Sequence, residues 1–495
     1  MRAVILLWAG FVLLIVSTLS AQTFSVANQQ PVSRVPYAQN ANSVGTKRLP
    51  LDVMSHLASN SDAIAVNVLE DNGGWGPFSW NDGWWGFKTW STPGVNDCCD
   101  VPLYYATSSD PWYVVTECDY SPKQNNGGWN PVGIPFHAPN RAEFTQSNAD
   151  NSLAIWDQAQ KYLVEFYQSG NPGETLPACG ATSASAACPI HMHSCSLAKF
   201  DSDQDWGGVS STRPGNFAPF MGVIRFQELM QGQINHALYL NTECVNGPAV
   251  FPDVYKTMAW LCGVSPAPGP ANRPLEGSLF FLDYTDSQIQ SMNIPPWKKA
   301  VLTAFAHYGG YVGSTGLSGQ TLNPYLESAE AYSYKGVSDP FPKWAASQSG
   351  VVNVGCNSSD CRYTFPFLDK VPWVNGPTCP SNLYAGGCDL SHHMHIASPC
   401  VAAGLANQPA NAATAPCVWP LTLKSSGNGS VAISMKGSTS QSTSLLYFGK
   451  ESPVTLTAKP GTNSTFGGWG GACSGTNLSC NVTVSQATTV TASFQ

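Results

Sequence analysis

The sequence predicts a mainly β protein with a β-sandwich or jelly-roll-like core, a few peripheral helices and a small β-rich segment at the C-terminus. Short apolar or alternating segments, which are typical of strands, outnumber helical patterns. The 495 residues include 45 Gly and 37 Pro, which supply many turns between strands. Apolar residues make up 43% of the chain and charged residues only 11%, which favours a packed core over a disordered chain.

The N-terminus has the pattern of a secretory signal peptide. Arg2 precedes an apolar run over residues 3–16, and small residues follow up to Ala21. The run is shorter than the roughly 18 apolar residues that a membrane span needs. We therefore expect residues 1–21 to be cleaved near Ala21 and the mature protein to be secreted, extracellular or periplasmic, without a membrane span.

Residues 22–417 form the predicted main domain. Apolar segments at 152–156 and 162–167 predict a β-hairpin, and residues 234–240 predict a strand. A helix is expected over residues 295–309, with Pro at its start and Gly309 at its end, and a shorter one over 225–230, closed by Gly232. Residues 347–417 lack a periodic core and are expected to pack on the larger part as a cysteine-rich extension.

The last part of the chain, residues 418–495, is predicted to be a separate β-module. Alternating segments at 430–433, 454–457, 482–484 and 489–492 are separated by Gly, Pro and Asn turns. The segments around Val454, Trp469, Cys480 and Phe494 resemble the bacterial repeat module related to the internalin B-repeat. This resemblance implies a small β-grasp-like domain, a disulfide between Cys473 and Cys480, and a role in attachment to a cell surface or matrix.

The middle of the chain carries a second resemblance. The hairpin around Trp156, the segment from Gly222 through Glu228 to His236, and the segment that begins at Tyr308 are similar to landmarks of uncharacterised large secreted bacterial proteins. That group has no assigned reaction. The resemblance implies work on carbohydrate without naming a substrate.

Sixteen cysteines in a chain with an export signal predict disulfides rather than free thiols. Two similar frames stand out, each with cysteines nine residues apart ahead of a His-Met-His triplet: Cys179 and Cys188, then Cys379 and Cys388. In an extended chain, His191 and His193 face one way, as do His393 and His395. The four imidazoles predict zinc or copper binding, with Met favouring copper; the alternative is two surface loops beside disulfides.

Aromatic residues are concentrated between residues 75 and 90. Indole rings stack on sugar rings while Asn and Asp bind hydroxyl groups, so this segment predicts a carbohydrate site; the alternative is that the rings fill the core. Arg213 is a candidate for holding an acidic sugar. The candidate stacking residues are Trp75, Trp80, Trp84, Trp85, Trp90 and Trp206.

Glycosidic hydrolysis needs two carboxyl groups across a cleft. The candidates for acid and base are Glu228, Asp205 and Asp150, with His236 placed to tune the pKa of Glu228. The acidic loop 201–205 has an alternative interpretation as a calcium site, since alternating Asp residues supply oxygen ligands. The other alternative for Glu228 and His236 is a charge at a helix end and a histidine satisfied in the core.

The net charge of −8 gives no basic footprint for nucleic acid, and no motif predicts a nucleotide cofactor. The leading hypothesis is a secreted enzyme, similar to glycoside hydrolases, that acts on an extracellular polysaccharide. A non-catalytic carbohydrate-binding or adhesive protein is the first alternative, and a metal-binding protein built on the His-Met-His triplets is the second. No cofactor is required by the leading hypothesis; a structural Ca, Zn or Cu ion is the alternative.

Overall fold

The computed structural model describes residues 44–70, 100–120, 131–144, 152–167, 174–199, 220, 222–242, 245, 250, 273–315, 322–327, 341–349, 352–356, 361–364, 393–405, 417–435, 438–441, 445–449 and 452–495. Strands predominate over helices in these ranges, so the predicted mainly β class is confirmed. The predicted signal peptide lies outside them. Within the described part of the chain, no helix is long and apolar enough to cross a membrane.

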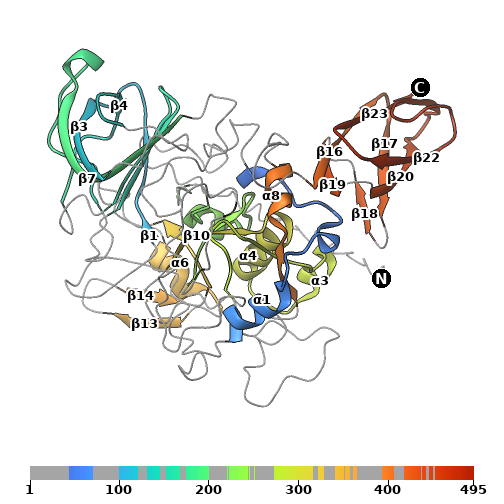
Figure 1. Ribbon diagram of the computed structural model, residues 1–495, viewed down its shortest axis with the longest axis horizontal. Helices are drawn as coiled ribbons and strands as arrows, with labels where there is room; N and C mark the ends of the chain where they lie inside the picture. Colours follow the sequence, from blue (N-terminus) through green and yellow to red (C-terminus); the bar gives the residue numbers. More distant parts are fainter. Residues whose placement is uncertain are drawn as a thin grey trace, which may run out of the picture.

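A six-stranded sheet lies at one side of the molecule (Figure 1). Its order is β2-β5-β6-β7-β3-β4, and the β5–β6 pair is the predicted hairpin. Strands β3 and β7 are parallel neighbours although they are far apart in the sequence. The strands are β2 (Leu103–Ala106), β3 (Trp112–Tyr120), β4 (Pro135–His137), β5 (Leu153–Asp157), β6 (Tyr162–Tyr167) and β7 (Cys188–Lys199).

A second sheet of five strands has the order β11-β8-β10-β9-β15. Helix α4 (Pro296–His307) packs on it through Trp297 and Val301, and the prediction of this helix is confirmed. Helix α2 (Phe226–Gln231) ends at Gly232 in the left-handed conformation, also as predicted. The strands are β8 (Leu238–Thr242), β9 (Leu279–Leu282), β10 (Gly310–Thr315), β11 (Leu322–Pro324) and β15 (Met394–Ala397).

Short elements surround these sheets. Strand β15 pairs with β9, so part of the predicted cysteine-rich extension belongs to the five-stranded sheet. Helix α1 (Ser61–Glu70) contacts this strand. The strand predicted over 234–240 begins only at Leu238, after the His236 side chain has turned toward helix α2. The remaining elements are η3 (Val44–Thr46), η4 (Val53–Ser55), β1 (Asp100–Val101), η6 (Ala184–Ala186), α3 (Asp286–Ser291), β12 (Leu326–Glu327), α6 (Phe341–Ser347), β13 (Val352–Cys356), β14 (Cys361–Thr364) and α8 (Pro399–Leu405).

The C-terminal module consists of two four-stranded sheets around one apolar core that includes Trp469 and Phe494. The predicted disulfide between Cys473 and Cys480 is present. Trp469 donates a hydrogen bond from its indole nitrogen to the carbonyl oxygen of Asn477, which lies between the two cysteines. The strands are β16 (Val418–Ser426), β17 (Gly429–Met435), β18 (Ser438–Gln441), β19 (Leu445–Gly449), β20 (Ser452–Pro460), β21 (Phe466–Gly471), β22 (Ser479–Val484) and β23 (Thr488–Phe494).

The module contacts the rest of the protein through the segment that contains η4 and through helix α8 (Figure 1). The hydroxyl of Ser452 donates a hydrogen bond to the Asp52 carboxylate. Strand β16 packs against α8, and a disulfide joins Cys400 of α8 to Cys417, the residue just before β16. The module is thus docked by side-chain contacts in addition to its covalent link.

Candidate functional site

Strands β3 and β7 present four polar side chains on one exposed face of the six-stranded sheet. Alternation along a strand points Glu117 and Asp119 outward from β3, and His191 and His193 outward from β7. The strands pair in parallel with Glu117 opposite His191. The local pattern therefore places two carboxylates beside two imidazoles, and we name these four residues the β3–β7 cluster.

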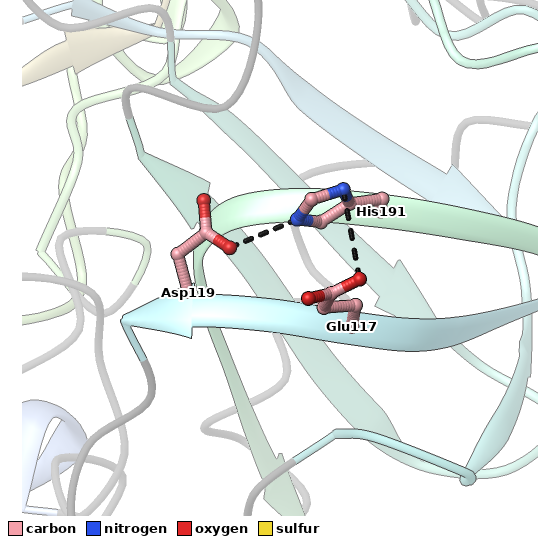
Figure 2. A group of neighbouring side chains, drawn as sticks. All are labelled: Glu117, Asp119 and His191. Atoms are coloured by element: carbon pink, nitrogen blue, oxygen red, sulfur yellow. Dashed lines mark hydrogen bonds and ion pairs between the residues drawn. The ribbon is translucent and has the colours of Figure 1, made fainter.

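Three side chains of the β3–β7 cluster, those of Glu117, Asp119 and His191, converge closely enough to share one ion. His191 Nε2 lies 2.9 Å from Asp119 Oδ1, and His193 Nδ1 lies 3.3 Å from Asp119 Oδ2. One ligand atom from each of Glu117, Asp119 and His191 fits within 4.8 Å of the others. Figure 2 shows the His191 ring between the two carboxylates of β3.

The charges of the cluster support each other. The hydrogen bonds that His191 and His193 donate lower the pKa of Asp119, which keeps this carboxylate ionised. The same interaction with Asp119 raises the pKa of His191. An ionised carboxylate beside two imidazoles is a donor set that divalent transition metals prefer.

The methionines between the histidines face the other way. Met192 and Met394 are buried in separate apolar clusters, on the opposite side of the strand from the flanking histidines. A thioether in that position cannot ligate an ion held by the imidazoles. The argument that Met favours copper therefore fails for these triplets, and nitrogen and oxygen donors remain.

The second histidine pair lies in the five-stranded sheet and has its own carboxylate. His393 Nδ1 forms a short hydrogen bond to Asp283 Oδ1, and His395 Nε2 lies 3.4 Å from Asp283 Oδ2. Asp283 directly follows strand β9, beside the start of β15. The four imidazoles thus form two separate pairs, each facing an Asp on a neighbouring strand.

Glu228 and His236 meet in the core, not at a cleft. His236 Nε2 lies 3.1 Å from a Glu228 carboxylate oxygen, while its Nδ1 bonds to the carbonyl oxygen of Ala237. Glu228 also accepts a hydrogen bond from the backbone N–H of Arg225 at the start of α2. Both residues are at least 98% buried, which favours the alternative of a structural pair over contact with a polymeric substrate.

The network around Glu228 is extended by other buried polar groups. Arg225 Nε donates to the Tyr105 hydroxyl, and Glu327 accepts the backbone N–H of Phe226. Burial raises the pKa of Glu228, but the opposite effects of His236 and Arg225 are larger in sum, and the pKa is lowered. This arrangement fixes α2 against strand β8 and the segment that contains Tyr105.

Several predicted site residues lie outside the described ranges, and their predictions stand as made. They are Asp150, Asp205 and the rest of the acidic loop, Arg213, and the tryptophans Trp75, Trp80, Trp84, Trp85, Trp90 and Trp206. Asp157, which follows Asp150 closely in the sequence, is described. It is buried and accepts a hydrogen bond from the His137 ring, a structural contact.

Sequence reasoning missed Glu117, Asp119 and Asp283. A signal for the first two exists in the chain: Glu-Cys-Asp repeats the alternation of His-Met-His, with an inward residue between two outward ligands. Only the pairing of β3 with β7 across about seventy residues brings these patterns together. Asp283 carries no such pattern and is defined by its position beside β15.

Disulfides reinforce the elements that carry the cluster. Cys118 pairs with Cys195 and links β3 to β7, and Cys179 pairs with Cys188 just before the first histidine pair. Cys379 and Cys388 of the second frame lie outside the described residues. No free cysteine occurs in the part of the chain that the structure describes.

The comparisons with known proteins bear on the C-terminal module. The searches against curated proteins and against solved structures found no match. The similarity of the middle region to large secreted bacterial proteins therefore stays a prediction. Disulfides together with a B-repeat module fit an extracellular protein. Residues 420–495 match the family model described as Divergent InlB B-repeat domain, which confirms the resemblance of the C-terminal segment.

Proposed function

We propose that this protein is an extracellular metal-binding protein that holds a divalent transition metal ion, zinc above all, at the β3–β7 cluster. The observation that carries the proposal is the convergence of Glu117, Asp119 and His191 (Figure 2), with His193 Nδ1 at 3.3 Å from the second oxygen of Asp119. The B-repeat module would attach the metal-binding part to its surroundings.

The spacing supports zinc. Bonds of about 2.0–2.1 Å in a tetrahedral site place neighbouring ligand atoms roughly 3.3 Å apart. The 2.9 Å between His191 Nε2 and Asp119 Oδ1 lies close to this value, and His193 Nδ1 lies 3.3 Å from the other oxygen, Oδ2. An ion can therefore replace the protons between these groups with only small side-chain movements.

The exposure of the cluster supports an open site. The histidine side chains are 55% and 47% exposed, so solvent reaches the ion from one side. Three protein ligands plus water are the arrangement of zinc sites that bind or polarise a further ligand. The Cys118–Cys195 disulfide supports the cluster by holding its two strands together.

Zinc titration of the oxidised full chain against a chromophoric chelator tests this proposal. The double variant His191→Ala/His193→Ala should lose one zinc equivalent relative to the wild type. His56→Ala is the matched control, because in the described part of the chain His56 pairs with one carboxylate, that of Asp52. Zinc stoichiometry and affinity equal to those of the wild type in the double variant would contradict the proposal.

A second candidate function is polysaccharide hydrolysis or binding, and the five tryptophans between residues 75 and 90 favour it. Since Glu228 and His236 are enclosed, Asp150 and Asp205 are the remaining predicted carboxylates for a hydrolase. Incubation of the protein with a panel of plant, fungal and bacterial polysaccharides tests both hydrolysis and binding. Released oligosaccharides support an enzyme, and depletion of the protein onto one insoluble glycan supports a binder. If neither is observed, this candidate function is ruled out.

A further inference from the structure

The second histidine pair faces a carboxylate in a more enclosed setting than the first. His393, His395 and Asp283 lie where strand β15 begins beside the end of β9. Asp62, from the first turn of α1, reaches His395 from the other side. We propose that Asp283, His393 and His395 form a second zinc site, with Asp62 as the residue that positions His395.

The two imidazoles of this site face the same carboxylate, each at a different oxygen. Both oxygens of Asp283 are engaged, one by His393 Nδ1 and the other at 3.4 Å from His395 Nε2. Two imidazoles on one carboxylate is the same donor set as at the β3–β7 cluster, on an unrelated sheet. Burial raises the pKa of Asp283, but the adjacent His393 and His395 imidazoles outweigh it and lower the pKa to about 2.

One nitrogen of this pair favours an ion over a hydrogen bond. His395 Nε2 is buried and has no hydrogen-bond partner among the described residues, since its approach to Asp283 lacks hydrogen-bond geometry. A buried polar atom without a partner costs free energy, so its lone pair needs another use. Coordination of a cation held between Asp283 and His393 supplies that use.

Asp62 completes the arrangement from behind. Its carboxylate lies 3.3 Å from His395 Nδ1, and because a carboxylate only accepts, Nδ1 carries the hydrogen. That tautomer leaves Nε2 free as a metal ligand. Histidines that bind metals usually donate their other ring N–H to a carboxylate in this way.

The half-buried position indicates a structural ion. His395 is only 9% exposed on its side chain, and the His393 ring stacks on Tyr284 with centroids 4.1 Å apart. An ion here links the end of β9 to β15. The hydrogen bond between His395 and Asp62 connects helix α1 to the same site. This contrasts with the exposed β3–β7 cluster, where solvent completes the coordination.

The test uses the full-length double variant His191→Ala/His193→Ala, so the result is independent of the β3–β7 cluster. This protein should bind one zinc equivalent, with X-ray absorption showing two imidazoles and at least one oxygen around the metal. Adding Asp283→Asn should abolish that binding. Adding Asp62→Asn should weaken it about 10- to 100-fold without changing the circular dichroism spectrum, because the Asp62 side chain is 79% exposed.

His307→Gln is the control, since among the residues that the structure describes His307 faces one carboxylate, that of Asp286. It should leave zinc binding unchanged. Absence of zinc from the folded double variant, or full binding after Asp283→Asn, would overturn the proposal. If Asp283→Asn does not fold, the zinc affinity of the Asp62→Asn variant and the X-ray absorption spectrum decide. A zinc affinity that Asp62→Asn leaves unchanged, or a zinc coordination shell without two imidazoles, would also overturn the proposal.

Discussion

Glu228 shows how environment decides what a carboxylate does. Its oxygens are occupied by the His236 ring and by the backbone N–H of Arg225, and its side chain is enclosed. A charge taken out of water is tolerated only when it is paired and hydrogen-bonded. We therefore interpret Glu228 and His236 as a structural pair that secures helix α2.

Acid should weaken this pair. The pKa of Glu228 is lowered in the folded state, so its stabilisation is fully present above its unfolded pKa of about 4.3 and is lost as pH falls through the folded value. Glu228→Gln lacks this proton linkage. The difference in unfolding free energy between wild type and variant should shrink as pH falls below about 5. A difference that stays constant with pH in denaturant titrations contradicts the interpretation.

At the residue scale, the sequence predicted that Glu228 and His236 lie close together but not what this contact does. The eight-residue spacing of Glu228 and His236 correctly suggested a contact, and the structure confirms the contact itself. Burial could not be deduced, because it depends on strands and helices that pack from elsewhere in the chain. Strand alternation implies that the Met192 side chain points away from His191 and His193. Only the structure shows that it packs in an apolar core there, where it cannot bind an ion held by those histidines.

At the scale of elements, the Cys118–Cys195 disulfide joins strands that are distant in sequence. Its sequence separation is 77, against 7 for Cys473–Cys480. A disulfide that closes a longer loop removes more entropy from the unfolded chain.

Removal of the first bridge by Cys118→Ala/Cys195→Ala should therefore cost about 4 kcal/mol of unfolding free energy, and removal of the second about 2 kcal/mol. Guanidinium denaturation of the two double variants measures both values. An equal loss, or a larger loss for the Cys473 pair, contradicts this ordering.

Local patterns predicted the local elements. The β5–β6 hairpin, helix α4 and the strands of the C-terminal module follow from residues that are neighbours in the sequence. The parallel pairing of β3 with β7 and the insertion of β15 beside β9 are long-range events. No periodicity encodes them, and they are the pairings that create both candidate metal sites.

At the scale of the whole molecule, the junction between α8 and β16 decides whether the module is docked or merely tethered. A Cβ atom added to Gly404 of α8 would lie 2.2 Å from a Val418 methyl carbon and 2.7 Å from the Val418 carbonyl oxygen. The close approach of helix and strand thus depends on the absence of a side chain at this position.

Gly404→Ala should lower the unfolding free energy by about 1–2 kcal/mol, because overpacking outweighs the gain in helix propensity. Gly180→Ala is the control, since a Cβ atom there meets nothing within 4 Å, and it should change stability by less than about 0.5 kcal/mol. Thermal unfolding of both variants measures the difference. Equal stabilities would mean that α8 and β16 are not tightly packed.

Anomalous diffraction at the zinc absorption edge, from crystals of the oxidised full chain grown with zinc, tests the metal-binding account most directly. The account predicts one peak about 2.0–2.1 Å from ring nitrogens of His191 and His193, and another between Asp283 and the His393–His395 pair. Peaks confined to other surface residues, or no peak at the β3–β7 cluster under saturating zinc, would contradict it.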